Sequence, residues 1–358
     1  GGARKFLLYR VNNDMVLNAA TSSCPTSSPS PIPVSPLVMA GNDTELLTRY
    51  YSGVNGYGEW TVASNDNRSL DVQHPEVNLT MDAYGANHQC RIIGSDLSCK
   101  GANAVGQLGD GTTTTSSSFV TVDATSMGGV TAVSIGSDFT CALDNDGDAW
   151  CWGEGEKYRL GDKDKNNSNV PRKTSMPNDG TKLVSLTSGQ KHTCGLGTDN
   201  NTYCWGSNEE GQMSADNSTN SIRQVSIIAD LSGPTKVVST GVNATFTCAI
   251  TQLSNASNDN ITECWGTDNS GRYNDPYTVP GITTAVDVAV GQNHACAALA
   301  DGSVRCWGDN SYNQAPSSIN VYTLRSKAIS IYAWDDYTCA SLENGGYTCW
   351  GDGNIWVN

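Results

Sequence analysis

The stretch HTCGLGTDNNTYCWGSNEEGQM, residues 192–213, contains two cysteines ten residues apart, followed by Trp-Gly and then by Gly-Gln. Taken alone, it is compatible with a metal clamp, a redox pair or a structural disulfide. The same pattern returns along the chain. Four further stretches share it: FTCALDNDGDAWCWG at 139–153, FTCAITQLSNASNDNITECWG at 246–266, HACAALADGSVRCWG at 294–308 and YTCASLENGGYTCWG at 337–351.

Two more copies depart from this pattern. The copy HQCRIIGSDLSCKG at 88–101 has Lys100 in place of the tryptophan, and AGNDTELLTRYYSGVNGYGEW at 40–60 has Glu45 and Tyr51 where the cysteines would be. The glycines that end the seven hairpins recur every 42 to 60 residues, at positions 53, 101, 153, 206, 266, 308 and 351. A propeller blade of four short antiparallel strands needs about 40–50 residues. The repeats therefore predict an all-β, seven-bladed β-propeller.

The composition supports this class and excludes others. Only 16% of the residues are charged, and short Val- and Ile-rich runs such as TAVSIG and KVVSTG, bounded by Gly, Ser or Asp, indicate strands. The formal net charge of -15 would repel a phosphate backbone, so we expect no nucleic-acid binding. No apolar run approaches the roughly 18 residues of a membrane helix, so we expect no membrane insertion.

Twelve of the thirteen cysteines form local pairs around turns that contain Asp, Asn or Gly. Two strands joined by such a turn place the cysteines opposite each other, within disulfide range. A zinc site needs four converging ligands, which blades that point apart do not offer, and no Cys-x-x-Cys is present. We therefore predict structural disulfides, no metal site, no cofactor and an oxidising, extracellular or cell-surface location. The predicted pairs are Cys90–Cys99, Cys141–Cys151, Cys194–Cys204, Cys248–Cys264, Cys296–Cys306 and Cys339–Cys349.

Comparison among the copies also removes the candidate catalytic residues. His88, His192 and His294 stand two residues before a cysteine, where other copies have Phe or Tyr, which indicates a packing position. The acidic run Asp144–Asp148 falls in a hairpin turn and lacks the EF-hand spacing, so turn chemistry is favoured over a weak calcium site. No catalytic constellation recurs with positional meaning. We expect no catalytic residues and no enzyme.

The turns after the Trp-Gly steps resemble a known family. KGANAVGQLGDGT at 100–112 and WGSNEEGQM at 205–213 are similar to repeats of the regulator of chromosome condensation family, whose members form seven-bladed propellers. The resemblance extends over roughly residues 30–358. Tyr158-Arg159 and Asn313-Gln314 replace Gly-Gln in two copies, and paired cysteines are not part of the pattern of the nuclear members.

The resemblance also suggests how the ring is completed. In this family a Pro-x-Pro-Val strand follows the Gly-Gln-Leu-Gly turn, and PSPIPVSPL at 29–37 is similar to it. The last copy stops at WGDGNIWVN, short of a final strand. We expect residues 29–37 to complete the last blade, which removes two exposed sheet edges, and we place the propeller domain at 29–358.

Residues 1–28 belong to no repeat and form an N-terminal arm. Its Ser-, Thr- and Pro-rich part predicts an extended, stiff linker, and about 25 extended residues reach roughly 80 Å. We expect the arm to be held either by its own propeller or by another subunit through strand addition. Cys24 is the unpaired cysteine, a candidate for an intermolecular disulfide, with a free thiol or a local partner as the alternative. The candidate assembly strand within KFLLYRV consists of Phe6, Leu7, Leu8, Tyr9 and Val11.

The sequence contains nine Asn-x-Ser/Thr motifs, which are acceptor sites for N-glycosylation in secreted proteins. We expect the motifs at Asn255 and Asn260 to be exposed, because they lie in the extended loop between Cys248 and Cys264. The nine candidates are Asn42, Asn67, Asn78, Asn166, Asn200, Asn217, Asn243, Asn255 and Asn260.

These features favour a secreted, glycosylated, non-enzymatic structural protein that self-associates into a filament or surface layer through its arm. The alternative is a monomeric extracellular binding module that holds a protein or carbohydrate partner on one propeller face. The resemblance also suggests two other functions, nuclear nucleotide exchange and light sensing. The disulfides argue against the first, and the repeated position of the tryptophans indicates packing between blades and not a light sensor.

Overall fold

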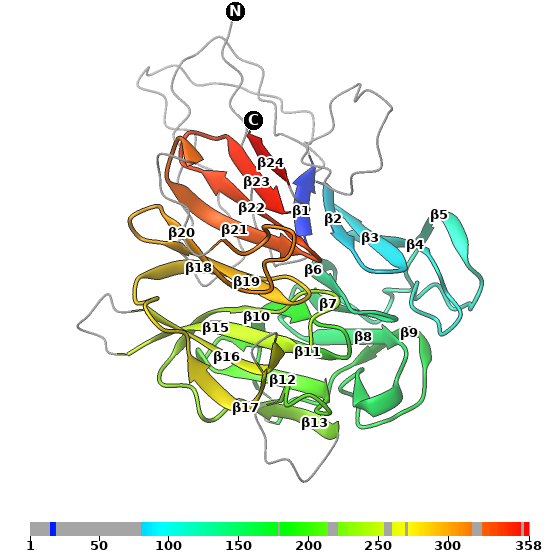
Figure 1. Cartoon of the computed structure of the whole chain (residues 1–358). Coiled ribbons are helices and arrows are strands. Elements are labelled where there is room, and N and C mark those ends of the chain that lie inside the picture. Colours follow the sequence, from blue (N-terminus) through cyan, green and yellow to red (C-terminus); the bar gives the residue numbers. More distant parts are fainter. Residues whose placement is uncertain are drawn as a thin grey trace, which may run out of the picture.

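The computed structural model describes residues 15–18, 80–177, 180–213, 221–253, 260–268, 271–316, 324–351 and 354–357. Apart from the short 3-10 turn η1 (Glu156–Tyr158), the elements in these residues are β-strands. Figure 1 shows them as a series of sheets that follow one another around the molecule in chain order.

The strands, in chain order, are β1 (Met15–Asn18), β2 (Thr80–Tyr84), β3 (His88–Ile93), β4 (Asp96–Gly101), β5 (Ser116–Thr121), β6 (Val130–Ile135), β7 (Phe139–Asp144), β8 (Ala149–Gly153), β9 (Ser168–Lys173), β10 (Leu183–Ser188), β11 (His192–Gly197), β12 (Thr202–Ser207), β13 (Ser221–Ile227), β14 (Thr235–Ser239), β15 (Phe246–Gln252), β16 (Asn260–Asp268), β17 (Gly271–Thr278), β18 (Ala285–Val290), β19 (His294–Leu299), β20 (Val304–Gly308), β21 (Ala328–Trp334), β22 (Tyr337–Leu342), β23 (Tyr347–Gly351) and β24 (Asn354–Val357).

The strands form six antiparallel sheets, each made from strands that are consecutive in the chain. We call them blade 1 (β2–β5, with β1 added beside β2), blade 2 (β6–β9), blade 3 (β10–β13), blade 4 (β14–β17), blade 5 (β18–β20) and blade 6 (β21–β24). This is the propeller arrangement that the repeats predict. The seventh copy, at 40–60, lies outside the described residues.

The second and third strands of each blade form a hairpin that holds the paired cysteines opposite each other. In blade 3, for example, Cys194 pairs with Cys204 in the strand register. All six predicted pairs are disulfide-bonded, with Cα atoms 3.9 to 4.1 Å apart. The structure thus confirms one hairpin disulfide in each of the six blades, which indicates an oxidising compartment.

The core lies between the blades, where the sheets pack face to face. One continuous apolar cluster runs from Ile92 in blade 1 through Phe139 and Trp152 in blade 2 to Trp205 in blade 3. The tryptophans that follow the second cysteine are fully buried in four blades. Burial of large apolar side chains supplies most of the attraction between sheets, at roughly 25 cal/mol per Å² of apolar surface. The predicted role of these tryptophans in packing between blades is confirmed.

Two short strands, β1 and β24, bear on how the expected ring closes. Residues 15–18 of the arm form β1, which pairs with β2 of the same chain. The chain does not end before a fourth strand in blade 6, as the sequence suggested, because β24 pairs with β23. The residues of β24, NIWV, are favourable for strands, and four of them suffice for a short edge. The segment 29–37 lies outside the described residues, and its place in the last blade stays a prediction.

Candidate functional site

The three repeat histidines are buried and make hydrogen bonds between neighbouring blades. The Nε2 atom of His88 lies 2.8 Å from Oγ1 of Thr140 in the next blade. His192 and His294 make the same contact at 2.7 Å. The threonines that they reach are Thr247 and Thr338. The sequence predicted packing at these positions and missed the polar contact.

The contact between blades 1 and 2 shows the full arrangement. The carbonyl oxygen of Gln107, in the turn after β4, accepts bonds from Thr140 Oγ1 and Trp152 Nε1, both at 3.0 Å. Because the threonine gives its one hydroxyl proton to Gln107, Nε2 of His88 must donate to it. His88 is therefore the neutral tautomer with the proton on Nε2, and it is committed to this network.

Burial lowers the pKa of these imidazoles. The pKa falls to about 3 for His88 and His192 and to about 4 for His294, and desolvation is the main cause in each. A general acid or base works best with a pKa near the operating pH. These histidines stay neutral well below pH 6, and their position is structural.

The Gly-Gln turn that takes part in these contacts between blades is held by its own glutamine. The side-chain Oε1 of the glutamine accepts the backbone N–H two residues earlier, at 3.1 Å for Gln107, 2.9 Å for Gln212 and 2.8 Å for Gln314. The residue before the glutamine has a positive φ, 88° at Gly106. Glycine adopts this conformation without strain, which explains its recurrence there. Asn313 takes the same conformation with a φ of 62°.

Blade 2 departs from this turn, because Tyr158-Arg159 replaces Gly-Gln. Trp205, which packs on this turn from blade 3, has no hydrogen-bond partner for Nε1 among the described residues. Ion pairs are present instead. Arg159 pairs with Glu154 inside blade 2, and Lys157 of blade 2 reaches Glu209 of blade 3 at 2.7 Å.

The acidic run Asp144–Asp148 is held as a turn. Asp144 Oδ1 accepts the backbone N–H groups of Asp146 at 3.0 Å and Asp148 at 2.9 Å. Asp148 forms ion pairs with Lys173 and Lys182, both at 2.7 Å. Within the part of the chain that the structure describes, no cluster of three or more His, Cys, Asp or Glu side chains is placed to hold a metal. The turn interpretation is the one that these contacts favour.

Four of the nine glycosylation candidates lie in described residues, and they fall into two classes. Asn166 and Asn200 are exposed. Asn243 and Asn260 are half-buried, and their side-chain amides donate to Asp335 Oδ1 at 2.8 Å and to the Ala285 carbonyl at 3.0 Å. Asn260 begins β16, so the expectation that it lies in an exposed loop is wrong. The candidates outside the described residues are Asn42, Asn67, Asn78, Asn217 and Asn255, as are Cys24 and the assembly strand at 6–11.

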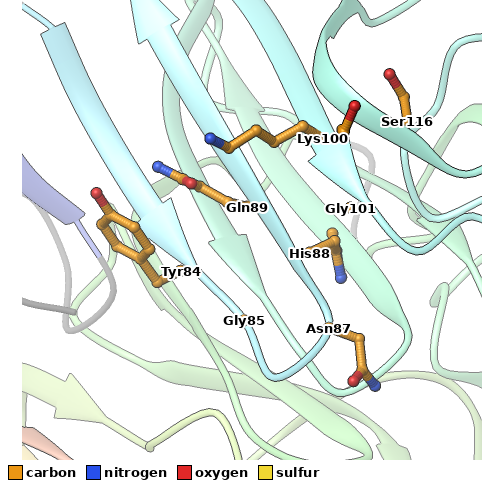
Figure 2. Close-up of a pocket in the computed structure, with 9 residues that line it drawn as sticks. Tyr84, Gly85, Asn87, His88, Gln89, Lys100, Gly101 and Ser116 are labelled. Atoms are coloured by element: carbon orange, nitrogen blue, oxygen red, sulfur yellow. The ribbon is translucent and has the colours of Figure 1, made fainter. Parts of the chain in front are cut away.

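A shallow depression of about 350 Å³ lies on blade 1, on the face that points away from blade 2. Tyr84, Gln89 and Lys100 stand opposite one another on three adjacent strands and line it, as Figure 2 shows. Lys100 Nζ and the Arg91 guanidinium lie 4.7 Å and 4.5 Å from the centre of the Phe119 ring. Arg91 is paired with the buried Asp82, at 2.5 and 2.9 Å, so its charge is balanced within the surface. This surface is polar and aromatic and includes Lys100, and it is the candidate interaction surface of the described propeller.

Comparison with known proteins identifies the repeats. A family model described as the regulator of chromosome condensation (RCC1) repeat matches residues 130–159, 183–212 and 285–314, and a second with the same description matches 146–196. The matched residues are repeats of the regulator of chromosome condensation type. The residues matched by the first model lie in blades 2, 3 and 5. They include the hairpins that contain Trp152, Trp205 and Trp307.

Relatives with this repeat include much larger proteins. Human E3 ubiquitin-protein ligase HERC2 is 29% identical over 160 residues, which is 45% of this chain and 3% of HERC2. The ultraviolet-B receptor UVR8 of Arabidopsis thaliana is 24% identical over 266 residues, covering 70% of this chain and 58% of UVR8. The chain thus spans less than two thirds of either relative.

Solved structures show the same fold. Human WBSCR16 superposes with a TM-score of 0.64 at 15% identity, over 76% of this chain and 74% of that one. Yeast RCC1 (Prp20), solved with Kap60, gives 0.62 at 17% identity, over 75% and 69%. At such identities the likeness concerns the fold alone, and it confirms the propeller. In the described residues, no helix has the length and apolar character needed to cross a membrane.

Proposed function

We propose that this protein is a secreted, non-enzymatic structural protein that self-associates through its N-terminal arm. The pairing of β1 with β2 is the observation that supports this most directly. Met15 stands opposite Ala83 and Asn18 opposite Thr80, which makes β1 a fifth strand on the first edge of blade 1. Among the described sheets, the first strands of the other five blades have no added strand. Blade 1 therefore has an edge that binds a strand of the arm.

The connection between the two strands leaves room for exchange between chains. Residues 19–79 join β1 to β2 and span at most roughly 200 Å at 3.3–3.6 Å per residue. The β1 strand of one copy can therefore reach β2 of another with the same backbone hydrogen bonds. Exchange of an identical element is a low-cost route to association, and a head-to-tail exchange that does not close produces a filament.

The covalent structure supports a role outside the cell. Six buried disulfides require an oxidising compartment to form and persist. The exposed Asn166 and Asn200 are the described acceptor sites best placed for a glycan. The commitment of the three repeat histidines to contacts between blades supports a non-enzymatic role, and the ligase relative matches this chain over only 3% of its length.

The test compares the full chain with a variant that cannot pair β1. Val16→Pro removes a backbone N–H from β1, and Ser28→Pro, in the Pro-rich part of the arm, is the matched control. We expect light scattering to show assemblies for the full chain and the control and a smaller mass for Val16→Pro. A monomer in all three samples, or unchanged assembly in Val16→Pro, contradicts the proposal.

One observation favours a second function, the binding of another protein on one propeller face. Yeast RCC1 (Prp20), which shares the fold, was solved bound to Kap60, and the reported properties of Prp20p include binding to Gsp1p and histones. By analogy of fold, the loops of this propeller provide a face for a protein partner. A chain that remains monomeric in light scattering and captures one defined extracellular protein would favour this function over self-association.

A further inference from the structure

The junctions between successive described blades are not held by the same contacts. Two hydrogen bonds recur at the junctions of blades 1 and 2, 3 and 4, and 5 and 6. One joins a histidine to a threonine of the next blade, and the other runs from a tryptophan Nε1 to the glutamine carbonyl of the preceding blade's turn. The histidine bonds are His88–Thr140, His192–Thr247 and His294–Thr338, and the tryptophans are Trp152, Trp265 and Trp350.

The junction between blades 4 and 5 has lost the residues for both bonds. Phe246 stands at the histidine position, and Ala295 stands at the threonine position. At the Gly-Gln position blade 4 has Gly271 and Arg272, which belong to strand β17 and not to a turn. The buried Nε1 of Trp307 in blade 5 therefore has no partner among the described residues, which is destabilising. The Trp307 side chain is also only half-buried.

The junction between blades 2 and 3 shows a different solution to the same loss. Phe139 replaces the histidine there, and Trp205 Nε1 has no partner among the described residues. However, Trp205 is fully buried, and the ion pair of Lys157 with Glu209 crosses the junction at 2.7 Å. In the described part of the chain, the junction between blades 4 and 5 has neither the two recurring bonds nor an ion pair. An apolar cluster shared by the two blades packs this junction.

The turn between the first and second strands of a blade, here called its first turn, is longer in blade 4. Two residues separate Gly189 from His192 in blade 3, and blades 1, 2 and 5 have the same spacing. Four residues separate Gly241 from Phe246 in blade 4. This turn passes close to blade 5, since a Cβ atom at Gly241 would overlap the carbonyl oxygen of Val290. Glycine permits this approach of two backbones.

The longer turn of blade 4 makes a contact beyond blade 5. Asn243 Nδ2 donates to Oδ1 of Asp335, in the first turn of blade 6, at 2.8 Å. The carbonyl oxygen of Asp335 also accepts the backbone N–H of Gln292 from blade 5, at 3.2 Å. The φ of Asp335 is 31°, which is unfavourable for a residue other than glycine. Such a conformation persists where the surrounding contacts hold it.

We propose that Asn243 and Asp335 form a clasp that keeps the junction between blades 4 and 5 closed, and that this junction opens when the clasp is released. The opposite end of the junction is joined separately. There the side-chain amide of Asn260 donates to the Ala285 carbonyl at 3.0 Å, where the chain enters blade 5. This end serves as the hinge. Opening exposes the apolar cluster of the two blades, a surface that the closed form hides.

The test measures hydrogen exchange at the indole N–H of Trp307 by NMR, on the full-length, oxidised protein with labelled tryptophan. Exchange at a buried N–H requires a local opening. Asn243→Ala should speed exchange at Trp307 about fivefold, the change that one hydrogen bond typically makes in an opening equilibrium. Trp152, between blades 1 and 2, should keep its rate in the same sample. An unchanged rate at Trp307, or an equal acceleration at both tryptophans, overturns the proposal.

Blade 1 offers a matched control in its own first turn. Asn87 Nδ2 donates to Asp138 Oδ1 at 3.4 Å, across a junction that has both recurring bonds. Asn87→Ala should therefore leave the exchange of Trp152 unchanged. A fivefold acceleration of Trp152 would show that first-turn contacts hold every junction alike, which contradicts a special role for the clasp.

Substitutions at Asp335 test the other half of the clasp. Asp335→Asn keeps an acceptor oxygen and should retain the wild-type exchange rate at Trp307, whereas Asp335→Ala should accelerate it. Equal rates in these two variants contradict the proposal. Asn243 begins a glycosylation motif, and a glycan would be attached to the Nδ2 atom that the clasp uses. All samples therefore come from a host without N-glycosylation, so that only the clasp differs.

A variant that adds a bond tests the proposal in the opposite direction. Phe246→His with Ala295→Thr installs the histidine–threonine pair of the other junctions, and it should slow exchange at Trp307 and offset Asn243→Ala. Exchange that is as fast as in the wild type, or faster, in a folded double variant contradicts the proposed weakness of this junction. None of these variants alters β1, so failure of the test leaves the assembly proposal standing.

Discussion

The two sides of blade 1 meet their surroundings by different physical means. Toward blade 2, Ile92 and the Cys90–Cys99 disulfide join an apolar cluster, with the buried His88–Thr140–Gln107 network inside it. Away from blade 2, the same sheet presents Lys100, Phe119 and the ion pair of Arg91 with Asp82. The apolar side draws its stability from area removed from water, whereas the charged side favours a partner of opposite charge. One sheet can therefore have one side that is stabilised by apolar burial and another side that selects its partner by charge.

The largest effect should come from breaking the apolar side. Trp152→Ala removes a fully buried indole and its bond to Gln107, and we expect a loss of about 3–5 kcal/mol in the free energy of unfolding. Lys100→Ala changes the corresponding position on the charged side and should cost less than about 1 kcal/mol. Urea unfolding under oxidising conditions measures both. Equal losses would show that the two sides do not differ in this way.

The disulfides of blades 1 and 2 should contribute equally, although one face of blade 1 is charged. Replacing Cys141 and Cys151 by Ala opens a loop with a sequence separation of 10, and the chain-entropy account predicts a loss of about 2–3 kcal/mol. Replacing Cys90 and Cys99, with a separation of 9, should cost a similar amount. Urea midpoints of the two double variants check this. A loss confined to one blade would mean that packing, and not loop length, sets the contribution.

The buried histidines predict that stability falls in acid. Folded His88 and His192 have a pKa of about 3, against 6.5 for an exposed imidazole, so the unfolded chain binds protons first as the pH falls. Their contribution is fully present above pH 6.5 and is lost between pH 6.5 and about 3. At pH 5 each costs about 2 kcal/mol relative to pH 8.

The control for this titration comes from the repeat itself. His192→Phe installs the residue found at Phe139 and Phe246, so it should flatten the dependence of the unfolding free energy on pH, whatever it costs at pH 8. Unfolding curves between pH 5 and pH 8 give the slope. An unchanged slope in this variant would contradict the assignment of the acid sensitivity to His192.

The smallest effect should come from the exposed ion pair between blades 2 and 3. Lys157 and Glu209 are about one third exposed, and pairs of this kind contribute at most about 1 kcal/mol. Lys157→Ala should therefore change the unfolding free energy only slightly, and added salt should shrink the difference further. A loss that is large, or insensitive to salt, would show that the charged turn of blade 2 is held in another way.

Much of the fold could be predicted from the sequence because the same repeat occurs several times along the chain. The spacing of Cys194 and Cys204 around an Asp-Asn-Asn turn specifies a hairpin and a disulfide without knowledge of the neighbours. The same comparison showed that His192 is interchangeable with Phe. These are local properties, decided by strand geometry and turn chemistry.

The contacts between blades were harder to predict, because they join residues about 50 positions apart. A signal was present in the copies. Each repeat histidine is followed, one copy later, by a threonine at the position that it contacts, as for His88 and Thr140. Phe246 is followed by Ala295, but Phe139 is also followed by a threonine, Thr193, so the pattern alone does not identify the contact. This pattern can be interpreted only when it is known that successive copies stack face to face.

Three further features depended on pairing partners that a single strand does not reveal. β1 is only four residues long and was not singled out, because its strand character comes from the edge of β2. β24 completes blade 6 with residues that looked too few for a strand. The sequence predicts a loop at Asn260, whereas its pairing with Gln252 extends the hairpin by several residues.

By itself, the sequence determined the number and spacing of the repeats, the six disulfides and the packing positions, since each is fixed by residues close together in the chain. Only the tertiary structure decided that His88 is bound to Thr140, that the arm adds a strand to blade 1, and that Lys100 stands in a depression where other blades have a buried tryptophan. These properties belong to surfaces shared by two sheets, and such surfaces exist only once the blades are packed together.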